Sequence, residues 1–153
     1  MASADENRAL VAHIIEEGFN QGNLDVADGR FRDDYVAHVP GVPALPSGPD
    51  GFKRVIGMWR TAFGDLHMTI EDMVCEGDLV ANRFTTRGTH DGPLFGFGPT
   101  GNTIEIHGQE LHRIQDGLVA ESWICDDVPG LLVQLGLIQM PTPGGPPGGG
   151  PPS

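Results

Sequence analysis

The sequence predicts an α+β domain: a cone-shaped, curved antiparallel sheet packed on three N-terminal helices and enclosing an apolar pocket. Apolar residues recur with a helical period before residue 64 and with an alternating period in four segments after residue 65. Two connections between the alternating segments, 76–78 and 115–117, are short enough to require antiparallel hairpins. Helices followed by hairpins are typical of the α+β class, and a curved sheet over helices leaves a pocket for a small ligand.

The first half of the chain predicts the helices. Residues 4–20 carry one apolar stripe, preceded by a Ser-x-x-Glu sequence that fits a capping box. Asn23 is expected to cap a short second helix, and Asp50 is expected to cap a third over residues 51–63. The apolar residues of the third helix are spaced for one buried face: Phe52, Val55, Ile56, Trp59 and Phe63.

The second half of the chain predicts the sheet. Four segments alternate between apolar and polar residues and are expected to be strands: 66–75, 79–90, 102–114 and 118–127. Ahead of them, DYVAHV is a brief extended piece, and four prolines make residues 40–49 a stiff loop. The segment GLLVQLGLI predicts a short helix that closes the fold.

Composition divides the chain into one globular domain, residues 1–140, and a flexible Pro/Gly-rich tail, residues 141–153. Nine basic against 21 acidic residues give a net charge of −12, which argues against nucleic-acid partners and anionic membrane surfaces. No apolar run reaches the roughly 18 residues of a membrane helix. Because the acidic N-terminus does not resemble a signal peptide, we expect a soluble, cytoplasmic protein.

The last predicted strand ends in a candidate acid or base. In ESWICDDV, alternation places Trp123 and Asp127 on one face and Asp126 on the other. A carboxyl group beside Trp123 and other apolar walls would have its pKa raised toward the range of a general base. The alternative is that Asp127 caps the helix that begins near Pro129.

The histidines are further candidates. In TIEIHGQELHRI, His107 lies on one face and Glu110 with His112 on the other, where the carboxylate can orient the imidazole. A hydrogen-bonded structural role is the alternative for these strand histidines. His38 and His90 flank loops near the expected mouth of the pocket, with solvated or turn-stabilising roles as their alternative.

Three aromatic residues are expected to wall the pocket, with a plain core role as the alternative: Trp59, Phe63 and Phe84. Neither the histidines nor Cys75 and Cys125 show the spacing of a metal site, so we expect no metal. Nucleophile-elbow, phosphate-loop and zinc-protease motifs are absent from the sequence.

Four stretches of the sequence together resemble the SnoaL-like polyketide cyclases of the nuclear-transport-factor-2-like superfamily: NRALVAHIIEEGFNQGNLD, DYVAHVP, RGTHDGPLFGFGPTG and DGLVAESWICDDVPGLLVQLG. The resemblance spans about residues 5–138, and W-x-x-x-D-x-x-G-x-x-x-Q-L-G is its most specific part. It implies a cone-shaped α+β barrel. It also implies that the aspartate opening D-x-x-G-x-x-x-Q-L-G, here Asp127 rather than Asp126, is the acid/base of an intramolecular aldol closure, assisted by His112.

These residues favour a cofactor-independent cyclase that closes a ring in a hydrophobic polyketide-type intermediate bound against aromatic walls, with Trp123 among them. One alternative is epoxide hydrolysis or epoxide-driven ring formation, which relatives carry out with an Asp–Arg–Asp arrangement. The sheet arginines Arg83, Arg87 and Arg113 show no such pairing in the sequence. The other alternative is a carrier or sensor that binds a small molecule in the same cone without converting it.

The apolar residues of the sheet predict self-association. One small cone is not expected to bury all four of the apolar residues Ile104, Ile106, Leu118 and Ile124. Part of this apolar surface should therefore be covered by a second copy of the chain. The family resemblance implies dimerisation through the sheet. We therefore expect a homodimer or homotetramer.

Overall fold

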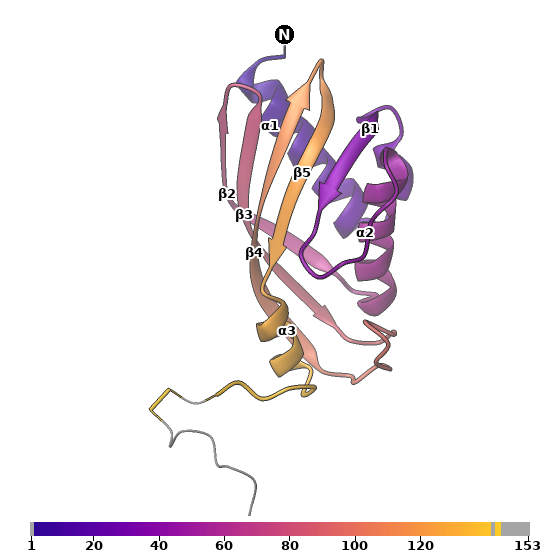
Figure 1. Cartoon of the computed structure of the whole chain (residues 1–153), viewed down its shortest axis with the longest axis vertical. Coiled ribbons are helices and arrows are strands. Elements are labelled where there is room, and N and C mark those ends of the chain that lie inside the picture. Colours follow the sequence, from indigo (N-terminus) through magenta and orange to yellow (C-terminus); the bar gives the residue numbers. More distant parts are fainter. Residues whose placement is uncertain (1, 142, 145–153) are drawn as a thin grey trace, which may run out of the picture.

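The computed structural model describes residues 2–141 and 143–144 (Figure 1). The helices are α1 (Ala4–Ile14), a π-helical turn that continues it (Ile15–Asn20), a 3₁₀ turn (Leu24–Ala27), α2 (Pro49–Ala62) and α3 (Val128–Gln134). The strands are β1 (Phe31–His38), β2 (His67–Glu76), β3 (Leu79–Thr89), β4 (Thr103–Gln115) and β5 (Leu118–Asp126). The α+β class and the four long strands predicted from the sequence are therefore confirmed.

The five strands form one mixed sheet in the order β1-β5-β4-β3-β2. Strands β2 to β5 pair antiparallel, but β1 pairs parallel with β5, so the prediction of a wholly antiparallel sheet is wrong at this edge. A parallel pair requires a long connection, and here the connection from β1 to β5 contains α2 and three strands. The sequence pattern identified the extended segment but carried no signal for its distant partner.

Helices α1 and α2 lie against one face of the sheet, which we call the inner face (Figure 1). Only two of the three expected N-terminal helices are α-helices, because Leu24–Ala27 is a single 3₁₀ turn and the third α-helix, α3, follows β5. The predicted capping box of α1 is confirmed by the reciprocal hydrogen bonds of Ser3 and Glu6.

The start of α2 differs from the prediction that Asp50 caps it. The helix begins at Pro49, with Gly48 at the N-cap position and Asp50 within the first turn. Proline suits the first helical position because its fixed φ is already helical, and Gly48 has a φ of 78° that other residues rarely adopt. The Gly-Pro pair, rather than the aspartate side chain, therefore determines where α2 starts.

Strand alternation divides the sheet residues between the core and the outer face. The inner positions of β4 are all buried: Ile104, Ile106, Gly108, Glu110, His112 and Ile114. Phe63 and Phe84 are also fully buried and belong to the core. Of the four apolar residues that one chain was not expected to bury completely, Ile104, Ile106 and Ile124 are each at most 4% exposed, and Leu118 is half-buried.

The predicted tail, residues 141–153, lies outside the described residues apart from Pro141, Pro143 and Gly144. Over the residues that the structure does describe, none of the helices has both the length and the apolar character needed to cross a membrane.

Candidate active site

A pocket of about 350 Å³ opens where β5 leads into α3. Its lining comes from the segment after β1, helix α2, the loop before β4, and α3. Its lining is almost entirely apolar: Val39, Pro40, Gly41, Val42, Met58, Trp59, Phe95, Phe97, Asp126, Val128 and Leu132. Pockets of this size and character bind small organic molecules.

Asp126 is the titratable residue in the lining of this pocket. Alternation along β5 turns Ser122, Ile124 and Asp126 toward the inner face, and Asp126 pairs with Gly108 of β4. Burial and the nearby charge of Glu110 raise the pKa of Asp126 to about 7. A carboxyl group with that pKa is present in both its ionised and its protonated form at neutral pH, as acid/base catalysis requires.

Gly108 makes room for this carboxyl group. A Cβ at position 108 would lie 2.5 Å from Cζ of Phe84 and 3.0 Å from Oδ1 of Asp126. Any larger residue would therefore have to displace the ring or the carboxyl group.

Asp127, the predicted acid/base, lies elsewhere. It is exposed and is the N-cap of α3, where its Oδ1 accepts a hydrogen bond of 2.9 Å from the backbone N–H of Gly130. The expectation that Asp127 lies against Trp123 in an apolar pocket is wrong, because that side of β5 is the outer face and the strand ends at Asp126. The structure thus matches the capping alternative for Asp127 and brings Asp126 to the pocket.

Glu110 and His112 form a buried polar network behind the pocket. Glu110 Oε1 accepts a 2.8 Å hydrogen bond from Asn82 Nδ2, and His112 Nε2 lies 3.1 Å from the same oxygen, off the direction of a hydrogen bond. His112 Nδ1 lies 2.6 Å from Ser122 Oγ. Burial acts to raise the pKa of Glu110, but the charge of the adjacent His112 and the hydrogen bond from Asn82 outweigh it and lower the pKa. Glu110 and His112 share a face, as predicted. Neither lines this pocket, contrary to the expectation that Glu110 binds the substrate and His112 assists catalysis there.

Three predicted site residues lie on the outer face instead. The His38 ring stacks on Trp123 with a centroid distance of 5.4 Å, and His38 Nε2 lies 2.7 Å from Glu121 Oε2. His107 is exposed, with Nδ1 3.1 Å from Thr85 Oγ1. The prediction that Trp123 walls the inner pocket is wrong for the same reason as for Asp127, since both lie on the outer side of β5.

Among the predicted aromatic walls, Trp59 lines the pocket, whereas Phe63 and Phe84 are fully buried core residues that do not reach it. Phe95 and Phe97, in the loop between β3 and β4, provide the other aromatic walls, and sequence reasoning missed them. The sequence feature that could have identified them is the presence of two aromatic residues in an otherwise Gly-rich loop. His90, next to this loop, is fully buried and accepts a 3.1 Å hydrogen bond from the backbone N–H of Thr100 at Nδ1, which fits the turn-stabilising alternative.

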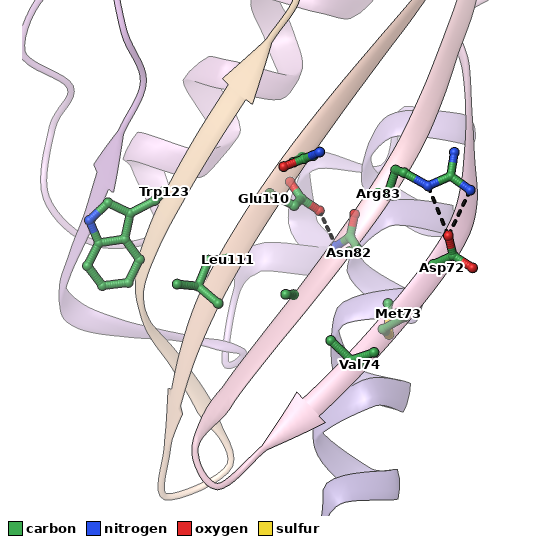
Figure 2. A pocket seen from close by; sticks show the side chains of 10 residues that line it. Asp72, Met73, Val74, Asn82, Arg83, Glu110, Leu111 and Trp123 are labelled. Carbon is green, nitrogen blue, oxygen red and sulfur yellow. Dashed lines mark hydrogen bonds and ion pairs between the residues drawn. The ribbon is translucent and has the colours of Figure 1, made fainter.

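A second pocket, of about 420 Å³, lies on the outer face of the sheet (Figure 2). Trp123 and Leu111 line one side, and Val74 lines the other, next to the exposed ion pair of Arg83 with Asp72. Glu110 also lines it, but its side chain is buried in the network described above. The outer pocket therefore offers apolar contact surface, and the buried carboxyl group at it, Glu110, is already bound by Asn82.

The sheet arginines do not reach the inner pocket. Arg83 pairs with Asp72, Arg87 with Glu105 and Arg113 with Asp78, all at or near the protein surface. Within residues 2–141 and 143–144, no three His, Cys, Asp or Glu residues are placed to hold a metal ion.

Comparison with solved structures shows close overall similarity. TsrD from Streptomyces laurentii matches with a TM-score of 0.81 and 28% identity, over 90% of this chain and 100% of that one. IdmH from Streptomyces antibioticus, described as a candidate polyketide cyclase, matches with a TM-score of 0.73 and 33% identity, over 85% of this chain and 98% of that one. A SnoaL-like protein from Jannaschia sp. CCS1 shares the fold, with a TM-score of 0.80 at 21% identity, over 91% of this chain and 99% of that one.

No curated protein matches the chain by sequence. The family comparison covers most of its length, because residues 9–135 match the SnoaL-like polyketide cyclases. IdmH, at 33% identity, is also matched over nearly its whole length. The chain therefore belongs to the SnoaL-like polyketide cyclase family.

Proposed function

We propose that the protein is a cofactor-independent cyclase that closes a ring in a polyketide-type intermediate by intramolecular aldol addition. The observation that supports this function is the position of Asp126, a carboxyl group with a raised pKa in an otherwise apolar pocket. Such a group can take up and return one proton without a cofactor, because the carbonyl groups of the substrate themselves delocalise the negative charge of the enolate.

The proposed reaction has two proton transfers at one carboxyl group. The ionised Asp126 removes a proton from a substrate carbon flanked by two carbonyls, and the resulting enolate attacks an internal carbonyl to form the new C–C bond. The alkoxide produced by that attack then takes the proton back from the protonated Asp126. The product is an isomer of the substrate, so atoms, electrons and protons all balance.

The walls of the pocket suggest how such a substrate would bind. Trp59, Phe95 and Phe97 provide aromatic surface for flat, apolar rings, and Met58 and Leu132 add aliphatic surface. Among the described residues that line the pocket, none is a lysine or an arginine, which favours a neutral substrate over a carboxylate or a phosphate ester. His112 acts behind Asp126 in this proposal rather than on the substrate, because it is only 4% exposed and does not line the pocket.

Epoxide chemistry, the first alternative, finds no support in the pocket. It requires an acid for the epoxide oxygen beside a base for water, and the sheet arginines are paired with carboxylates away from the inner pocket. The second alternative, a carrier or sensor, predicts binding without conversion and is separated from the cyclase by experiment.

The experiment compares Asp126→Asn with Asp127→Asn. The probe is a synthetic aryl-substituted linear triketone, and formation of the cyclic isomer is followed by chromatography and mass spectrometry. We expect Asp126→Asn to lower the rate of ring closure by about 10²–10⁴-fold, the usual contribution of a general acid/base. Asp127→Asn is the matched control and should retain most of the activity, since asparagine caps helices as well as aspartate does.

Two outcomes would contradict the proposal. Full activity of Asp126→Asn together with loss of activity in Asp127→Asn would return the acid/base role to the capping residue. Tight binding of the triketone by the unmodified protein with no conversion at all would favour the carrier.

A further inference from the structure

The inner face of the sheet holds a second carboxyl group, Glu110, next to Asp126. The two residues lie on adjacent strands, since Gly108 pairs with Asp126 and Glu110 pairs with Ile124. They are diagonal neighbours on the same face, a geometry that places Cβ atoms within about 7–8 Å. The β4 residue directly opposite Asp126 is Gly108, so no side chain projects beside the Asp126 carboxyl group at that position.

Glu110 is held in its ionised form by its neighbours. Its side chain is about 1% exposed, and its Oε1 accepts from Asn82 and lies close to His112 Nε2. Asn82 on the neighbouring strand β3 and His112 on β4 both contact this same oxygen. His112 is in turn fixed by Ser122 of β5. A carboxylate held so firmly has neither the position nor the freedom to act on a substrate.

The remaining surroundings of the two carboxyl groups are poor in charge. The titratable groups that face them are Tyr35 from β1, whose pKa is raised by burial, and His112 from β4. Helix α2 presents Met58 and Trp59 to the pocket, and the segment after β1 presents only apolar residues. Asp127, next in the sequence, is exposed to solvent, so the buried charge that acts on Asp126 in the described part of the chain is that of Glu110.

From this geometry we propose that Glu110 is a positioning residue for Asp126: its buried charge opposes ionisation of Asp126 and so keeps that carboxyl group available as a proton donor. The inference rests on the proposed function and assigns a purpose to a polar network that the ring-closing step does not touch. Burial of an ionised carboxylate is costly, and the hydrogen bond from Asn82 and the close approach of the His112 ring are what make it tolerable here.

The test is a carbon-13 NMR titration of the full-length protein labelled at the carboxyl carbons of Asp and Glu, with Asp126→Asn used to assign the signal of Asp126. We compare the unmodified protein with Glu110→Gln, which keeps the size and the hydrogen-bond acceptor of Glu110 but removes its charge. The midpoint for Asp126 should fall by about 1 pH unit or more, the range over which an adjacent charge acts. The matched control is Glu105→Gln, which removes an outer-face charge of the same strand and should leave the midpoint unchanged.

An unchanged or raised midpoint in Glu110→Gln would overturn the proposal. If that variant does not fold, the unmodified protein still decides: Glu110 must remain ionised over the whole range in which Asp126 titrates, and a Glu110 midpoint above that of Asp126 would overturn the proposal. The titration does not depend on turnover. Failure of Asp126→Asn to slow ring closure would therefore refute the proposed function without affecting this result, and the reverse also holds.

Discussion

Replacing Asp126 by asparagine should stabilise the protein at alkaline pH. The pKa of Asp126 is about 7 in the folded protein against a usual value of 3.8, so between these values the folded state holds a proton that the unfolded state has released. The free energy of unfolding therefore falls as pH rises through this window. The contribution of the group is complete below pH 3.8 and is lost as pH passes about 7.

The size of the effect follows from the same two values. A gap of about 3 pH units corresponds to about 4 kcal/mol, which is an upper bound because Asp126 is only partly buried as a residue. Asparagine has nearly the same shape and no charge to lose. Only the two pH units from 5 to 7 fall in both this window and the measured range, so the upper bound there is about 2.7 kcal/mol. The difference in stability between Asp126→Asn and the unmodified protein should therefore grow by about 1–3 kcal/mol between pH 5 and pH 8.5 in favour of the variant.

Urea unfolding at these two pH values measures the difference directly, since the unfolding free energy falls linearly with denaturant. Asp127→Asn is the control, because that side chain is exposed and should give the same difference at both pH values. If the free energy of unfolding of Asp126→Asn instead differs from that of the unmodified protein by the same amount at pH 5 and at pH 8.5, ionisation of this carboxyl group does not destabilise the folded state. The assignment of Asp126 as a tuned acid/base would then be refuted.

Two further predictions concern packing. Gly108→Ala should lower the free energy of unfolding in urea by about 1–3 kcal/mol, because the new methyl group overlaps the Phe84 ring 2.5 Å away. A decrease of less than about 0.5 kcal/mol would contradict the packing described. A homodimer formed through the outer face should give, by light scattering, about twice the 16.3 kDa of one chain. Val74 lines the outer pocket and is 66% exposed, so we expect it to contribute to that contact. Val74→Lys should therefore shift the measured mass toward that of the monomer. A monomeric unmodified protein would contradict the prediction.

The sequence was informative about strands but not about which face of each strand is the inner one. Alternation along β5 correctly separated Trp123 and Asp127 from Asp126, yet the large aromatic residue suggested the wrong face as the interior. The better signal was on β4, where Glu110 and His112 share a face with Ile104, Ile106 and Ile114. Once β4 and β5 are paired, that face continues onto Ser122, Ile124 and Asp126.

Other features depend on contacts between distant parts of the chain. The parallel pairing of β1 with β5 brings residues 31–38 against residues 119–123, and no local pattern encodes such a partner. Phe95 and Phe97 become pocket walls only because the loop between β3 and β4 lies against α2 and α3. Local signals such as the capping box and the short hairpin connections were reliable because each involves residues close together in the sequence.

The most direct test of the central claim, that Asp126 is the base for ring closure, is the pH profile of kcat/KM for the triketone probe. A base in the free enzyme with a pKa of about 7 predicts that kcat/KM rises about tenfold per pH unit below that value and levels off above it. Asp126→Asn should abolish this limb and Asp127→Asn should retain it. A profile that is flat from pH 5 to pH 9, or one that keeps its rise in Asp126→Asn, would contradict the account.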